Sequence, residues 1–124
     1  MTVKDLYDAI GANYAEAEER LMSDKFISKY IIKYAEDKSF DVLMDEWNGA
    51  RDDEKLFRAA HTLKGVCLNL ALDNLLKYAE PITEEYRPSN SNKTGNVDSL
   101  FEKLADEQKK TIELITEYKN SLPD

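Results

Sequence analysis

Apolar residues recur three and four positions apart along most of the chain, the spacing that places them on one face of an α-helix. No segment alternates apolar and polar residues as a half-buried strand does. The stripe that ends at Tyr34 gives way at Phe40 to a second stripe, two residues out of register with the first. This slip predicts a break at about residues 37–39, with Ser39 as the N-cap of the following helix. The predicted core positions of these two helices are Ile27, Tyr30, Ile31 and Tyr34, then Phe40, Leu43, Met44 and Trp47.

The other helices are predicted at residues 3–21 (interrupted at Gly11), 52–70, 72–86 and 97–120. Pro81 should kink or break the third of these, because proline cannot donate a backbone hydrogen bond. The last helix carries its apolar stripe at Leu100, Leu104, Ile112, Ile115 and Tyr118. Such helices with short connections favour antiparallel neighbours. We therefore expect an all-α fold, an antiparallel up-down four-helix bundle with an additional short N-terminal helix, in which residues 1–20 form an extension and residues 21–124 the main domain.

Composition limits the possible partners and the compartment. The 124 residues fit one domain, and the net charge of −8 would repel both nucleic-acid backbones and anionic lipids. No apolar run approaches the roughly 20 residues that cross a bilayer, and the first residues lack the apolar stretch of a signal peptide. Cys67 is the only cysteine, and its place on an apolar stripe predicts a buried thiol. We expect a cytoplasmic protein with no nucleic-acid partner and no membrane insertion.

The helix at residues 52–70 carries a histidine on the side opposite its apolar stripe. With His61 set at 0°, the apolar positions of this helix centre on about 190°, so the sole histidine is expected to face solvent. Phe57 and Leu68 project beside it, at about 320° and 340°, outside the apolar stripe, and Arg58 lies at about 60°. Two large apolar side chains and a cation around an exposed histidine indicate a docking patch for another protein.

His61, Lys64 and Gly65 together have the chemistry of a phosphoryl carrier. An exposed imidazole is a nitrogen nucleophile that can hold a covalent group. Lys64, three residues further on, can reach the phosphoryl oxygens as a point charge. Gly65 leaves space for a second protein to approach in line with the attacking and leaving atoms, and a mid-helix glycine costs about 0.5–1 kcal/mol relative to alanine. Phosphoryl transfer needs mainly positioning and charge stabilisation, which this small site can share with a partner.

The segment from Ala59 to Gly65, with the sequence Ala-Ala-His-Thr-Leu-Lys-Gly, resembles the phosphorylation motif of histidine phosphotransfer (HPt) domains, His-x-x-Lys-Gly. The resemblance covers most of the chain from about residue 20, and leaves out residues 1–15 and 87–97. One departure is Ala71, where many members have a glycine after the leucine that ends the motif helix.

This resemblance implies a role for each motif residue. His61 would be the phosphoacceptor, Lys64 would assist the phosphate and Gly65 would give access to it. Family members are helical bundles without ATP sites, and they exchange phosphoryl groups with the aspartate-bearing receiver domains of response regulators and hybrid sensor histidine kinases. The resemblance therefore implies a phosphorelay carrier without kinase or ATPase activity of its own.

Other classes of function fit part of this pattern. A helical adaptor could bind a receiver or another protein without phosphotransfer, although it would have no use for Gly65. The chain could also be one domain of a larger sensor kinase, although Met1 at its start favours a stand-alone carrier. A di-iron site would need two Glu-x-x-His pairs, and Arg58 stands three residues before the only histidine, so we expect no metal. With no Gly-rich phosphate loop and no nucleophile triad, we expect neither a cofactor nor autonomous enzyme activity.

Overall fold

The computed structural model describes residues 1–123, and over this range it contains helices and no strand. The seven helices are α1 (Val3–Ile10), α2 (Tyr14–Leu21), α3 (Asp24–Tyr34), α4 (Ser39–Asn48), α5 (Asp53–Leu70), α6 (Asp73–Tyr86) and α7 (Asp98–Ser121). No helix in the described range is both long and apolar enough to cross a membrane.

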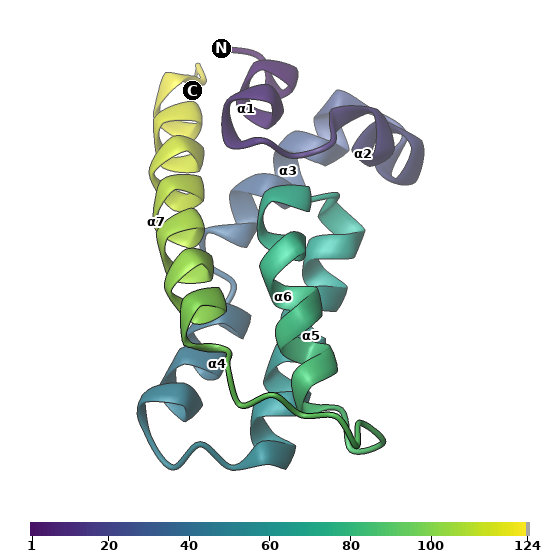
Figure 1. The fold of residues 1–124 in the computed structure, drawn as a ribbon. Helices are drawn as coiled ribbons and strands as arrows, with labels where there is room; N and C mark the ends of the chain where they lie inside the picture. The colour runs from purple at the N-terminus through teal and green to yellow at the C-terminus, as the bar shows by residue number, and fades with distance from the viewer. Residues whose placement is uncertain (124) are drawn as a thin grey trace.

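The arrangement is an antiparallel up-down bundle (Figure 1). Helices α3 and α4 form one broken arm, and α5, α6 and α7 then run alternately in opposite directions, with α5 packed between α4 and α6 and with α7 against α6. The short helices α1 and α2 lie at one end of the bundle, where α1 contacts α7. The predicted all-α four-helix bundle with additional N-terminal helical structure is therefore confirmed.

Side-chain caps fix where most of the helices begin. The side chains of Asn13, Ser23 and Asp52 each accept a hydrogen bond from a backbone N–H in the first turn of α2, α3 and α5. The predicted break between the first two core helices is present, but Ser39 as its N-cap is wrong by one position. Lys38 is the cap residue, and the carboxylate of Asp37 accepts from the backbone N–H of Ser39 at 2.8 Å.

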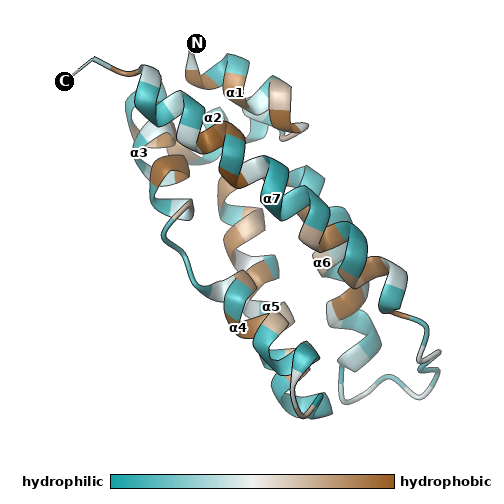
Figure 2. Ribbon diagram, turned by 90° about the vertical axis from the view of Figure 1, so that its left-hand side faces the viewer, coloured by the Kyte–Doolittle hydropathy of each residue, from teal (hydrophilic) through white to brown (hydrophobic). Residues whose placement is uncertain are grey.

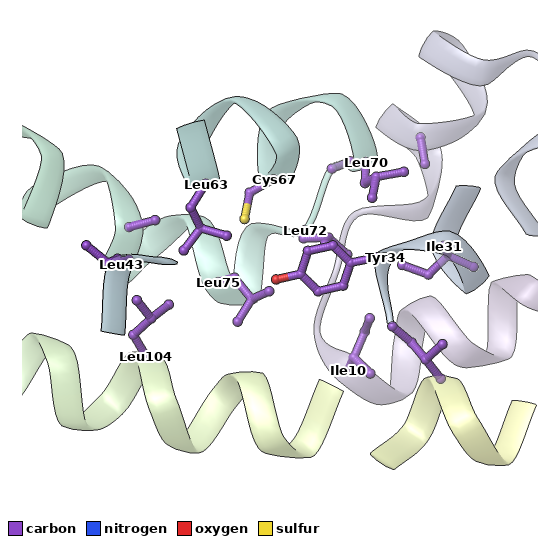
Figure 3. Packing of buried hydrophobic residues seen from close by; sticks show 14 of the residues in the cluster. Ile10, Ile31, Tyr34, Leu43, Leu63, Cys67, Leu70, Leu72, Leu75 and Leu104 are labelled. Atoms are coloured by element: carbon purple, nitrogen blue, oxygen red, sulfur yellow. The ribbon is translucent and has the colours of Figure 1, made fainter. Parts of the chain in front are cut away.

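The core consists of the inward faces of all the long helices, and α1 contributes to it as well (Figures 2 and 3). Leu63, Cys67 and Leu75 meet at its centre, across α5 and α6, and face Leu104 of α7. Each of these four side chains is fully buried. Because apolar burial is the dominant favourable term in folding, this contact layer holds α5 in a fixed rotation about its axis. That rotation determines which residues α5 presents to solvent.

Three predicted core stripes differ from those observed. On α4 only Leu43 is buried, and Phe40, Met44 and Trp47 are half-buried. On α3, Tyr30 is 39% exposed, because Ile27, Ile31 and Tyr34 already fill the contact with the bundle. On α7 the buried face is rotated, so that Leu100 and Ile112 are half-buried. The buried residues of α7 are Phe101, Leu104, Gln108, Thr111, Ile115 and Tyr118.

Polar residues can occupy the buried face of α7 because hydrogen bonds satisfy them. The Tyr34 hydroxyl donates to Gln108 Oε1 at 2.6 Å, and Asn74 Nδ2 donates to the Thr111 hydroxyl at 2.9 Å. A buried polar group with a partner avoids most of the free-energy cost of its burial. The hydrophobic periodicity alone could not reveal these positions.

Helix α6 continues through Pro81, so of the two predicted outcomes, a kink or a break, the break does not occur. The backbone carbonyl that loses its helical partner belongs to Lys77, four residues earlier. Both residues are exposed, so water can take the place of the missing donor.

The turn between α5 and α6 keeps a left-handed conformation at Ala71, with φ 55° and ψ 40°, although this residue is not a glycine. Its backbone N–H and that of Leu72 close the end of α5 by donating to carbonyls of the last helical turn. The departure from the family pattern at Ala71 therefore leaves a tight turn in place. This turn sets α6 antiparallel to α5 and brings the end of α6 beside the first half of α5.

Candidate functional site

His61 lies in the middle of α5 on its exposed side, as the helical phase predicts. The opposite side of the helix is locked into the core by Leu56, Ala60 and Leu63, all fully buried. Cys67 is also fully buried, and this burial raises the pKa of its thiol to about 12, so it is a core residue rather than a nucleophile. The rigid packing of α5 therefore presents a single imidazole to solvent.

An aromatic ring supports one side of the imidazole. Phe57, one turn earlier on α5, stacks on His61 with ring centroids 5.7 Å apart and an interplanar angle of 22°. The guanidinium of Arg87, from the end of α6, lies 5.3 Å from the centroid of the same Phe57 ring, within the range of a cation–π contact. The histidine, the aromatic ring and a cation therefore form one continuous stack.

The structure modifies the predicted docking patch. Phe57 and Leu68 are half-buried rather than free on the surface, since neighbouring side chains cover part of each. Arg58 is exposed and forms an ion pair with Glu54 one turn earlier on the same helix. These three residues remain on the His61 side of α5, and their contribution to partner binding is a prediction.

Lys64 extends towards α6, where its ammonium group faces a carboxylate. Its Nζ lies 3.9 Å from Oε1 of Glu84, and its side chain is only 20% exposed. The same carboxylate accepts two hydrogen bonds from Arg87, at 2.9 Å from Nε and 2.8 Å from Nη2. The hydrogen bonds from Arg87 hold the pKa of Glu84 below its usual range, so this group is ionised at neutral pH. Two cations next to the His61 stack thus share one anion.

Gly65 lies beside an open space. A Cβ atom built at this position would meet no heavy atom within 4 Å outside the local helix backbone. Gly65 also has ordinary helical φ, so neither packing nor backbone conformation in this chain requires a glycine here.

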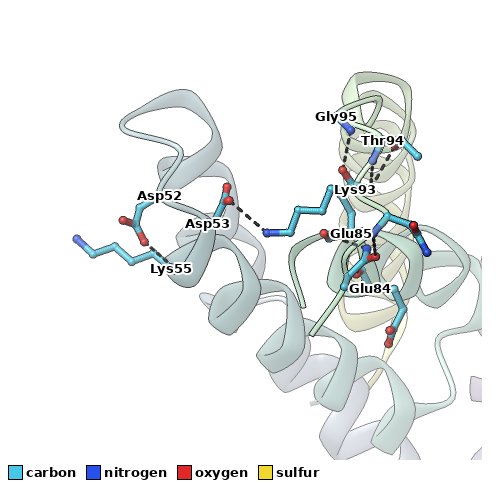
Figure 4. A network of polar contacts seen from close by, with 10 residues as sticks. Asp52, Asp53, Lys55, Glu84, Glu85, Lys93, Thr94 and Gly95 are labelled. Atoms are coloured by element: carbon cyan, nitrogen blue, oxygen red, sulfur yellow. Dashed lines mark hydrogen bonds and ion pairs between the residues drawn. The ribbon is translucent and has the colours of Figure 1, made fainter. Parts of the chain in front are cut away.

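The loop after α6 is tied down close to this site (Figure 4). Glu85, which is 9% exposed, accepts hydrogen bonds from the backbone N–H groups of Thr94 and Gly95 and from the Thr94 hydroxyl. Lys93 Nζ lies 3.3 Å from Asp53 Oδ2 at the start of α5. These contacts fasten the loop to the end of α6 and to the start of α5.

Glu84 and Arg87 are the site residues that the sequence reading missed. They come from the end of α6, more than twenty residues after His61, and no local spacing links them to it. Only the antiparallel pairing of α5 and α6 across the Ala71 turn could have indicated that the end of α6 lies near the motif.

Two hollows flank the exposed side of α5. One lies against α4 and is lined by Val42, Lys55 and Arg58, among others. The other lies against α2 and α3, where Tyr30 and Val66 line it. Val42 and Tyr30 are 55% and 39% exposed, so exposed large apolar side chains beside α5 come from neighbouring helices. A reading of α5 alone could not detect them.

Comparison with known proteins is consistent with this geometry. Residues 35–120 match the Hpt domain family, a segment that contains α4 to α7 and the whole His61 motif. No curated protein and no solved structure matches the chain. Hpt domains take part in histidine phosphotransfer in phosphorelays, where they interact with receiver domains and kinases, and they are phosphocarriers rather than kinases. By a match that spans most of its length and includes the exposed histidine, this chain belongs to the Hpt domain family.

Proposed function

We propose that this protein accepts a phosphoryl group on His61 from the aspartyl phosphate of one receiver domain and passes it to another. The observation that carries the proposal is the open space at Gly65, one turn from the exposed His61. Glycine destabilises a helix, and the fold does not need one at this position. Space at that position serves a second molecule that must reach His61. An adaptor that never brings a reacting group to His61 would gain nothing from this space.

The chemistry needs only groups that the two proteins bring together. The lone pair of an imidazole nitrogen attacks phosphorus, the P–N bond forms as the P–O bond to the aspartate breaks, and the carboxylate leaves with the electron pair. Onward transfer reverses these roles, with a receiver aspartate as the nucleophile. The receiver's own acidic pocket supplies the magnesium ion, and Lys64 of this chain offers positive charge to the phosphoryl oxygens.

The partner surface is the exposed side of α5 with its flanking hollows. Phe57, Arg58 and Leu68 surround His61 on α5, and Val42 extends this surface onto α4. Lys55 gives it positive charge in a protein whose net charge is −8, and Arg58 adds a second cation, which is paired with Glu54 in the free protein. This local charge is complementary to the acidic pocket of a receiver domain, including one within a hybrid sensor histidine kinase.

The test is transfer from a panel of receiver domains phosphorylated with a small-molecule phosphodonor. We expect the intact mass of the protein to increase by one phosphoryl group, and the modification to be lost in acid. His61→Gln should keep its helical circular dichroism spectrum, because surface changes usually cost under about 0.5 kcal/mol, and should gain no mass. Binding without any mass gain would leave only an adaptor role and would contradict the proposal.

A further inference from the structure

Glu84 places a negative charge close to the site where the proposed function puts a phosphoryl group. Its carboxylate lies 3.9 Å from the Nζ of Lys64, the cation assigned to the phosphate. It also binds Arg87 through two hydrogen bonds. A site that served only to bind a phosphoryl group would leave both cations free to contact its oxygens.

Both cations lie against Glu84 in the free protein: Arg87 is hydrogen-bonded to it, and Lys64 forms a longer ion pair with it. Lys64 Nζ is drawn towards α6, and Arg87 is held between Glu84 and the Phe57 ring that stacks on His61. A phosphoryl group carries about −1.5 to −2 charges at neutral pH and prefers such cations as hydrogen-bond donors. It must therefore compete with Glu84 for Lys64 and Arg87, and it is also repelled by the carboxylate.

We propose that Glu84 is a built-in competing anion that limits the stability of phosphorylated His61 and so favours onward transfer of the phosphoryl group. This inference rests on the proposed function of His61. The reaction it concerns is the exchange described above, in which a P–N bond at His61 is made as a P–O bond at a receiver aspartate is broken, or the reverse. Glu84 touches neither bond and acts through Lys64 and Arg87, so it is a positioning residue.

Glu84→Gln preserves the shape of the side chain and removes its charge. At equilibrium with one receiver domain, this variant should hold a larger share of the phosphoryl group on His61. Since Glu84 is half exposed, with 52% of its side chain accessible, we expect the His61-to-receiver partition ratio to rise by about two- to five-fold. Glu113→Gln is the matched control: it removes the same charge from an exposed position on α7, on another side of the bundle, and should leave the ratio unchanged.

Ionic strength gives a second readout that a purely structural role would not alter. The gain in Glu84→Gln relative to the unmodified protein should shrink between about 0.01 M and about 1 M salt, because the Debye length falls from about 30 Å to about 3 Å. An unchanged or lower partition ratio, or a gain that is independent of salt, would overturn the role of Glu84 while leaving phosphotransfer intact. If the unmodified protein takes up no phosphoryl group at all, the proposed function fails and this inference fails with it.

Discussion

A Cβ atom at position 65 would meet no heavy atom within 4 Å outside the local helix backbone, so substitution here can separate stability from access at a single residue. We expect Gly65→Ala to raise the free energy of unfolding by about 0.5–1 kcal/mol, through helix propensity alone. Gly65→Gln should also fold stably, but should slow transfer from a receiver because it fills the space that the partner needs. Urea unfolding and single-turnover transfer rates measure the two effects. Equal or faster transfer in the glutamine variant would remove the steric argument.

Lys64 is expected to assist transfer rather than carry the group. Lys64→Ala should slow single-turnover transfer by roughly ten-fold, less than the 10²–10³ seen for buried donors, because His61 is exposed and water weakens the effect of a single charge there. Lys103→Ala on α7, which removes one exposed cation on another side of the bundle, is the control and should transfer at the normal rate. Complete loss of transfer in Lys64→Ala would show that Lys64 does more than stabilise charge.

For single residues of α5, the helical phase was enough to predict that His61 is exposed and that Cys67 is buried. The pairing of Lys64 with Glu84 could not be predicted from the sequence, because it depends on which turn of α6 lies opposite which turn of α5. A change of one turn in that register would move the carboxylate by about 5.4 Å, beyond the reach of the pair.

The outer face of helix α5 is more buried than its apolar periodicity predicts. Phe57 is half-buried beneath Arg87, so Phe57→Ala should both weaken receiver binding and lower stability, by about 1 kcal/mol. Leu63→Ala, which empties a fully buried position on the same helix, should cost about 2–5 kcal/mol and leave affinity nearly unchanged in the folded fraction. Thermal unfolding and affinity for a receiver domain would be measured on both variants. Unaltered affinity in Phe57→Ala would exclude this ring from the docking surface.

The loop from α6 to α7 should be sensitive to acid through Glu85. Burial raises the pKa of Glu85, but the hydrogen bonds from Gly95 and Thr94 outweigh it and leave the pKa lowered. A lowered folded-state pKa means that the anchor contributes stability above the unfolded value of about 4.5, and loses it as the pH falls through the folded value. Hydrogen exchange at the Thr94 and Gly95 amides should therefore accelerate, relative to core amides, only below about pH 4.5. Glu85→Gln should show weak protection at neutral pH as well; strong protection there would contradict the anchor.

Element positions could be predicted where local chemistry decides them and not where tertiary contacts do. Ser23 begins α3 through its own side chain, as capping rules predict. Pro81, by contrast, lies on an exposed side of α6, where water can reach the freed carbonyl, and the helix is continuous through it. The sequence does not show which side of the helix the proline faces, so it could not decide between a continuous helix and the break.

For the molecule as a whole, the bundle acts as a frame that fixes one imidazole on its surface. The N-terminal residues belong to the same core: Tyr7 is fully buried on α1, and its hydroxyl donates to the carbonyl of Leu70 at the end of α5, at 2.8 Å. Whether residues 1–20 are a separable extension remains a prediction. The four-helix architecture could be derived from apolar spacing and loop lengths, since a bundle is the simplest way to bury amphipathic helices joined by short connections.

A carrier must both accept a phosphoryl group and give it up, and two-step transfer measures both. The protein would be phosphorylated from one receiver domain, purified, and mixed with a second, unphosphorylated receiver without any nucleotide. We predict that the phosphoryl group leaves His61 and appears on the aspartate of the second receiver, with no such transfer in His61→Gln. A protein that keeps the group, releases it only as inorganic phosphate, or transfers it equally well without His61 would contradict the account.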